Sequence, residues 1–142
     1  MITPRKLQAN ESNEYFKRYI NLVETQDIVA ALKNQLTDIE QFFRAWPRNK
    51  WNHTYAEGKW TIKELVQHII DAERVLSYRA LRFSRNDATN VPGFDEDWYV
   101  AYSNGNDRDF KDILQEFTHL RNATISLISL LFRLRSLTSS SN

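Results

Sequence analysis

The residues from Tyr55 to Arg85 constrain the fold most strongly, because they combine a helix start with a long apolar periodicity. Thr61 and Glu64 have the S/T-x-x-E spacing of a capping box, in which each side chain accepts a hydrogen bond from the other residue's amide. Apolar residues then recur at steps of three and four: Ile62, Leu65, Ile69, Ala72, Leu76, Ala80 and Phe83. They share one face of a helix roughly seven turns long. Such a face predicts a helix that packs against other helices.

Two more stretches show helical periodicity. Thr25 can cap a first long helix, with Asp27 near its positive end, and Pro47 ends it. The apolar positions of this helix are Ile28, Leu32, Leu36, Ile39, Phe43 and Trp46. A last helix is predicted from about Asp107 to Leu134, with a heptad seam of Phe110, Ile113, Phe117, Leu120, Thr124, Leu127, Leu131 and Leu134.

A short helix is also predicted near the N-terminus, capped by Ser12 and extending to about Val23. The expected fold class is therefore all-α, a bundle of three long helices plus this short one. The chain of 142 residues has the length of one domain, and three glycines and three prolines favour helices with short connections. We expect an N-terminal arm over residues 1–11, a bundle domain over 12–137 and a Ser-rich tail over 138–142.

Composition argues against several classes of protein. The chain has no cysteine, which excludes disulfides and thiolate metal sites and is typical of a cytoplasmic protein. No apolar run has the length of a membrane span, so no membrane association is expected. The net charge of +1 gives no field that attracts a polyanion. Because Arg74, Arg79, Arg82 and Arg85 are scattered around one helix, nucleic-acid binding is not expected either.

The long connection after Arg85 contains turn and acidic residues. Pro92 and Gly93 occupy the central positions of a predicted type II turn. Residues 95–97 are all acidic but lack the alternating ligands of a calcium loop, so a solvated acidic loop is the prediction. The aromatic residues that follow, Trp98, Tyr99 and Tyr102, are expected to anchor this connection to the end of the bundle.

His68 is the candidate metal ligand. It lies about 80° from the centre of the apolar stripe, on the flank of the predicted buried face. A histidine there is compatible with metal ligation, with general-base catalysis or with a half-buried structural role, and position alone favours the structural role. His53, in a connection, and His119, off the heptad seam, are weaker candidates and are expected at the surface.

The stretch YAEGKWTIKELVQHIIDAER, followed by YRALRFSR and VPGFDEDWY, resembles the DinB/YfiT-like family of small helical bundles. The resemblance extends from about Tyr15 to Leu131. It implies a four-helix bundle that binds a divalent metal, zinc or nickel, through three histidines, of which His68 matches the first. The other two, expected in an H-x-x-x-H on a last helix, have no counterpart here.

The resemblance also implies a function. In the family, the metal supports hydrolysis or thiol transfer on a small-molecule substrate. With one histidine of three and the C-terminal bundle helix missing or incomplete, we expect this chain as given not to be catalytic. One alternative is an active hydrolase or thiol transferase whose missing ligands come from another chain or from unexpected residues. The other is a metal-free helical dimerisation or binding module.

Three amphipathic helices from a four-helix family should leave an apolar groove. We expect a homodimer to fill it, with the heptad face of the last helix packed against its symmetry mate. A C-terminal segment folded back over the groove is the alternative.

Overall fold

The computed structural model describes the backbone of residues 12, 14–23 and 27–138, and the side chains as far as residue 131. Within these ranges the chain is all-α, as predicted, and contains no strand. The α-helices are α1 (Glu14–Ile20), α2 (Ile28–Ala45), α3 (Ile62–Ser84), α4 (Glu96–Tyr102) and α5 (Phe110–Thr138), and the two 3-10 helices are η1 (Arg48–Lys50) and η2 (Gly105–Asp107). The predicted arm over residues 1–11 lies outside the described residues.

The main helix starts follow from capping side chains. The capping box of α3 is present, with the Thr61 hydroxyl accepting from the Glu64 amide and the Glu64 carboxylate accepting from the Thr61 amide. Helix α2 is capped by Asp27, whose carboxylate accepts from the amide of Ala30 at 2.9 Å. The predicted cap, Thr25, lies outside the described residues. Each cap satisfies an amide that the helix itself leaves without an acceptor.

Several boundaries differ from the prediction. The last helix begins at Phe110 and not near Asp107, because residues 105–107 form η2, and it extends to Thr138, the first residue of the predicted tail. The short N-terminal helix ends at Ile20. Gly93 does not take the positive φ that a type II turn needs, and the chain leaves α3 through Asn86, which has a φ of 54°.

The prediction of a solvated acidic loop over residues 95–97 is wrong in part, because these residues form the start of helix α4. Asp95 caps this helix by accepting from the amide of Trp98 at 2.9 Å, and Glu96 and Asp97 occupy its first turn. The aromatic residues expected to anchor the connection are instead at the surface, with exposed fractions of 61% for Trp98 and 69% for Tyr102. Val100, on the same short helix, is the buried residue.

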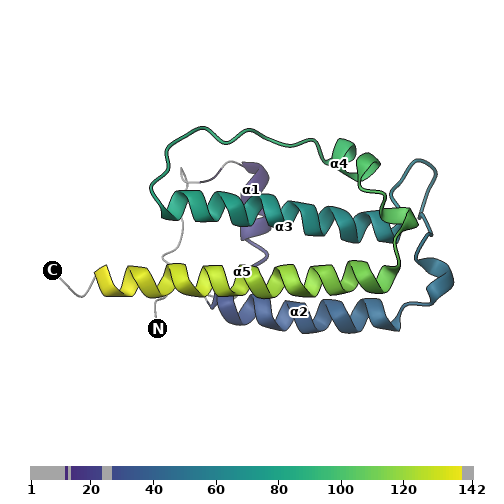
Figure 1. Ribbon diagram of the computed structural model, residues 1–142, viewed down its shortest axis with the longest axis horizontal. Coiled ribbons are helices and arrows are strands. Elements are labelled where there is room, and N and C mark those ends of the chain that lie inside the picture. Colours follow the sequence, from purple (N-terminus) through teal and green to yellow (C-terminus); the bar gives the residue numbers. More distant parts are fainter. Residues whose placement is uncertain (1–11, 13, 24–26, 139–142) are drawn as a thin grey trace.

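Helices α2, α3 and α5 form a layer with α5 in the middle, in contact with both neighbours (Figure 1). Helices α3 and α5 run in the same direction and α2 runs in the opposite one. After the end of α3, the chain must therefore run back along the length of this helix before α5 can begin. The connection that carries α4 and η2 makes this return.

The start of α5 is joined to the start of α3 by the 3-10 helix η2. Asn106 accepts from the Thr61 hydroxyl at 2.7 Å and donates to the Glu64 carboxylate at 2.9 Å. Gly105 is buried against α3, and a Cβ there would lie 3.7 Å from the backbone of Glu64. These contacts connect the cap of one helix to the entrance of the next.

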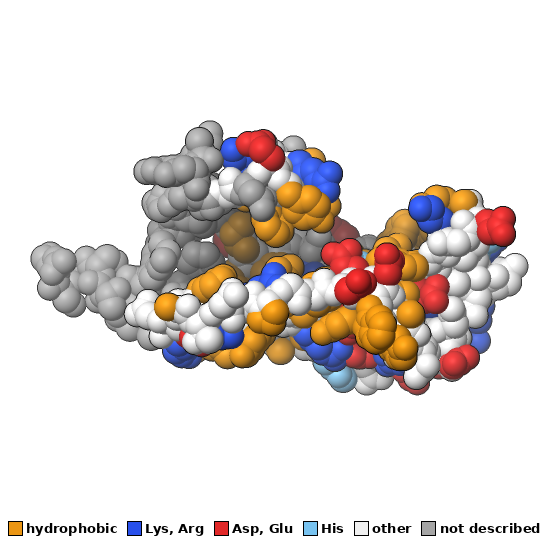
Figure 2. Space-filling model, turned by 90° about the horizontal axis from the view of Figure 1, so that it is seen from above, with side chains coloured by type: hydrophobic (Ala, Val, Ile, Leu, Met, Phe, Trp, Pro, Cys, Tyr) orange, Lys and Arg blue, Asp and Glu red, His pale blue; other side chains and the backbone are white. Residues whose placement is uncertain are grey.

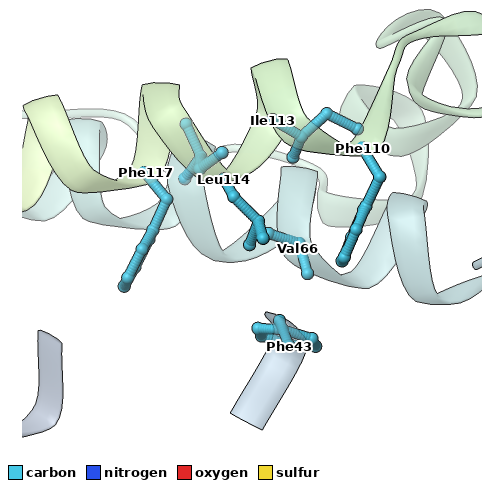
Figure 3. Close-up of a cluster of buried hydrophobic side chains, with 7 residues drawn as sticks. Phe43, Val66, Phe110, Ile113, Leu114 and Phe117 are labelled. Carbon is cyan, nitrogen blue, oxygen red and sulfur yellow. The ribbon is translucent and has the colours of Figure 1, made fainter. Parts of the chain in front are cut away.

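The core lies where α5 meets its two neighbours (Figure 3). Its buried members come from all three long helices: Phe43, Val66, Ile70, Phe110, Ile113, Leu114 and Phe117. Phe43 and Phe110 meet edge to face with ring centroids 5.8 Å apart, and Trp51 packs on Phe110 at 4.3 Å. The first half of the predicted heptad seam is therefore buried in the core between the long helices.

Helix α3 packs on this core with only one edge of its predicted apolar stripe: Ile62 and Ile69 contact the core, but the fully buried residues lie beside the stripe. The buried residues Val66 and Ile70 face α5, and Ser77 pairs with Thr124 of α5 at 3.0 Å. Leu65, Leu76 and Phe83 are instead exposed by 43%, 55% and 65%. With Ala72, these three residues form what we call the outer face of α3. Its three large side chains remain exposed within the described part of the chain.

The C-terminal half of α3 holds the return connection through two arginines. Arg79 donates to the carbonyl of Pro92 at 2.9 Å, and Arg82 donates to Asp87 at 2.6 Å and to the carbonyl of Thr89 at 3.2 Å.

None of the described helices combines the length and apolar character needed to cross a membrane.

Replacing Phe117 by Ala should reduce the free energy of unfolding by about 3–5 kcal/mol, because its fully buried ring would leave a cavity between the long helices. Phe42→Ala is the matched control, since Phe42 is 56% exposed, and should cost less than about 1 kcal/mol. Urea unfolding followed by circular dichroism measures both. Equal losses in the two variants would contradict a core that contains Phe117 and excludes Phe42.

Candidate functional site

His68 lies on α3 and is half-buried. Its ring packs against the indole of Trp60, with ring centroids 4.9 Å apart. The Nδ1 atom is buried and has no hydrogen-bond partner in the described part of the chain. A buried ring nitrogen usually has a partner, so the unsatisfied Nδ1 of His68 is a feature that the described contacts leave unexplained.

The polar residues next to His68 in sequence are engaged with other groups. Gln67 is buried, donates to Asp71 at 3.2 Å and accepts from Arg108 at 2.6 Å. Asp71 also pairs with Arg74 at 3.5 Å, as the i, i+3 spacing predicts. Through Arg108 and Arg74, these groups belong to the polar contacts at the junction of α3 with α5.

Glu73 takes part in a buried ion pair that joins the three long helices. Its carboxylate accepts from Arg121 of α5 at 2.8 to 3.0 Å, and Arg121 also donates to Gln35 of α2 at 2.5 Å. The side chains of Arg121 and Glu73 are only 7% and 11% exposed. The guanidinium lies 5.1 Å from the ring centroid of Phe117. A carboxylate in this position neutralises a buried cation, so we assign it a structural role.

Glu116 connects two arginines on the other side of the α3–α5 junction. Arg74 and Arg108 each lie 2.6 Å from its carboxylate. Burial pushes the pKa of Glu116 upward, but the hydrogen bonds and charges of the two arginines outweigh burial and hold this pKa below its ordinary value. Glu116 is therefore ionised near neutral pH.

The two weaker histidine candidates are at the surface, as predicted. His53 lines a cleft at the end of the bundle, and His119 lines a shallow one that includes Arg74, Arg108 and Glu116. Among the residues that the structure describes, no three His, Cys, Asp or Glu side chains gather closely enough to hold a metal ion.

The family resemblance implies a zinc or nickel ion held by three histidines. Three imidazoles suit zinc or nickel, and the orphan Nδ1 of His68 suits one coordination position. The nearby carboxylates of Asp71 and Glu73 are paired with arginines. The described residues do not fit a complete three-ligand site.

The cleft at the bundle end lies beside His68. It has a volume of about 640 Å³ and is lined mainly by apolar and aromatic side chains. Trp60 belongs both to this lining and to the contact with the His68 ring. Trp46, Tyr55 and Leu65 contribute further apolar surface, and Asp97 contributes a carboxylate from α4.

Two features of this region escaped the sequence analysis. The contact of Trp60 with His68 has a local signal, because the two residues lie eight positions apart at the start of one helix. The pairing of Glu73 with Arg121 spans 48 residues and has no such signal. A charged residue within a helix, such as Arg121, is expected at the surface unless a buried partner is known.

The geometry defines a class of protein: a bundle of long helices whose second long helix carries a half-buried histidine, His68. The sequence pattern described as the DinB superfamily matches residues 31–133. The chain belongs to the DinB superfamily. Neither the curated protein sequences nor the solved structures yield a significant match.

Glu116→Gln should lower stability above the pKa of an unfolded glutamate, about 4.3, because the folded carboxylate has a depressed pKa. This contribution is present above that pH and disappears as the pH falls through the folded pKa. The expected loss at pH 7 is about 1 kcal/mol or less, since the arginines are partly exposed. Thermal unfolding between pH 2.5 and 7 measures it.

Asp38→Asn is the control for this experiment, because Asp38 is exposed and has no ion pair in the described structure. It should leave the pH profile of stability unchanged. A loss in Glu116→Gln that is the same at pH 2.5 and pH 7 would show that the charge of Glu116 does not contribute.

Proposed function

We propose that this chain acts as a homodimeric binding module of the DinB superfamily and, as given, does not form a complete catalytic metal site by itself. The observation that carries the proposal is the outer face of α3. Leu76 and Phe83 are more than half exposed on it, and Leu65 is 43% exposed. Burying such side chains gains about 25 cal/mol for each Å² of apolar surface removed from water.

The outer face differs from the interface that the sequence favoured. Phe110, Ile113 and Phe117 of the heptad seam are fully buried inside the chain's own core. They are not available to a symmetry mate. The apolar surface that needs a partner is therefore on α3 and not on the first half of α5.

A second copy of the chain is the occupant that charge favours. Arg85, at the C-terminal end of α3, is exposed and has no carboxylate partner in the described structure. Helix α4 lies along the N-terminal half of α3, with Glu96 and Asp97 in its first turn (Figure 1). A two-fold antiparallel contact between two α3 helices brings the basic end of each against the acidic helix of the other. The net charge of +1 adds little repulsion.

A second candidate function rests on the orphan Nδ1 of His68. On the helical wheel His68 lies about 60° from the centre of the outer face, so a dimer built on this face would bring a partner close to it. In this alternative, His68 is one ligand of a zinc or nickel site completed by another chain. A bound divalent metal would lower the pKa of a water or a thiol and so support hydrolysis or thiol transfer on a small molecule.

Light scattering after size exclusion should give about twice the chain mass of 16.8 kDa for the wild type. Leu76→Glu and Phe83→Glu should each produce a monomer, because a charge would be buried in the interface. Phe42→Glu is the control, since Phe42 is equally exposed but lies on α2. A wild-type monomer at high micromolar concentration would refute the dimer. Dissociation by Leu127→Glu but not by Leu76→Glu would place the interface on α5.

Titration of the apo protein with zinc or nickel separates the two candidates. The binding module should show no stoichiometric site, because one imidazole binds a divalent metal weakly. One metal per chain or per dimer, lost in His68→Gln and retained in His119→Gln, would favour the shared metal site. Repeating the titration on Leu76→Glu shows whether that site needs the dimer.

A further inference from the structure

A second cleft lies between α2, η1 and the beginning of α5. Its volume is about 600 Å³. It is lined by Glu40, Phe43, Arg44, Trp46, Arg48, Trp51, Phe110, Lys111, Leu114, Gln115 and Thr118. It contains no histidine, so it is separate from the candidate metal ligand.

The charges around this cleft are mainly positive. Arg44, Arg48 and Lys111 line it, and none of them has a carboxylate partner in the described part of the chain. Glu40 is the one carboxylate in the lining, and it accepts a hydrogen bond from the Thr118 hydroxyl. Three unpaired cations against one carboxylate favour an anionic ligand.

The floor of the cleft is aromatic. The Trp51 ring packs on the buried Phe110 ring at 4.3 Å, and the guanidinium of Arg48 lies 6.0 Å from the Trp51 ring. The indole Nε1 of Trp51 is buried and has no acceptor in the described structure. Buried indole N–H groups usually find an acceptor, so this unsatisfied donor belongs to a residue of the cleft lining that lacks a polar partner.

We propose that this cleft binds a small organic anion with a flat apolar body, such as an aromatic carboxylate or an aryl phosphate. The flat body would pack against Trp46 and Trp51. The acid group would pair with Arg44, Arg48 and Lys111, since guanidinium groups match carboxylate and phosphate oxygens in geometry. Apolar walls with a few converging polar groups are typical of small-molecule sites.

Phenyl phosphate and benzoate are the probes. Each should shift the Trp51 indole N–H signal in a proton–nitrogen correlation spectrum, in which the chain has four such signals. Inorganic phosphate has the acid group without the aromatic body, and benzyl alcohol has the aromatic body without the acid group. Inorganic phosphate should therefore bind at least about tenfold more weakly than phenyl phosphate, and benzyl alcohol at least about tenfold more weakly than benzoate. The ratio between the two aromatic probes shows which acid group the cleft prefers.

Lys111→Gln and Arg44→Gln should each weaken phenyl phosphate about fivefold, because each removes one charge from the acid-binding side of the cleft. Both residues are exposed, so these variants should keep the fold. Lys33→Gln is the matched control, an exposed lysine of α2 outside the cleft, and should leave the affinity unchanged. Trp51→Phe keeps a ring but removes the N–H, and should weaken both aromatic probes.

Three results would overturn the proposal. The first is the absence of any shift of the Trp51 signal at millimolar phenyl phosphate. The second is equal binding of inorganic phosphate, which would show a non-specific basic surface. The third is equal weakening by Lys33→Gln and Lys111→Gln, which would show that only net charge matters. Because neither His68 nor α3 is involved, failure here leaves the dimer proposal unaffected.

Discussion

The packing of α5 between α2 and α3 is the interaction on which the rest of the structure depends. Phe110, Ile113 and Phe117 are fully buried there, and they contact both neighbouring helices within one core. One turn beyond Phe117, Arg121 joins Glu73 and Gln35, so the same junction carries a buried ion pair. Apolar contacts supply most of the stability of such a junction, and the ion pair penalises arrangements that would leave a buried charge without its partner.

This junction decides which surfaces remain for function. Because Val66 and Ile70 are turned toward α5, the other apolar side of α3 is left at the surface. Hydrophobic side chains are visible at the surface beside acidic ones when the molecule is viewed from the side of α4 and the return connection (Figure 2). On the same helix, His68 packs against Trp60, and its Nδ1 has no hydrogen-bond partner among the described residues. The two clefts share Trp46 in their linings but differ in chemistry.

Sequence reasoning was successful where the physical cause is local. The Thr61–Glu64 capping box needs only four consecutive residues, and the periodicity of α2, α3 and α5 needs only one helix each. It failed for α4, because seven residues are too few to show a helical period and three acidic residues read as a loop. The predicted start of the last helix near Asp107 was also wrong, since a 3-10 turn and the start of an α-helix contain similar residues.

The sequence by itself determined the all-α class, the three long helices and the superfamily, because caps, apolar periods and long motif matches are properties of consecutive residues. Only the tertiary structure decided which side of α3 is buried, since Val66 and Leu65 are both apolar and the choice depends on the helix that packs against them. It also decided that Arg121 is buried, because its partners, Glu73 and Gln35, are 48 and 86 residues away. Contacts between residues so far apart in the sequence follow from the whole arrangement of helices, which no single stretch of the chain specifies.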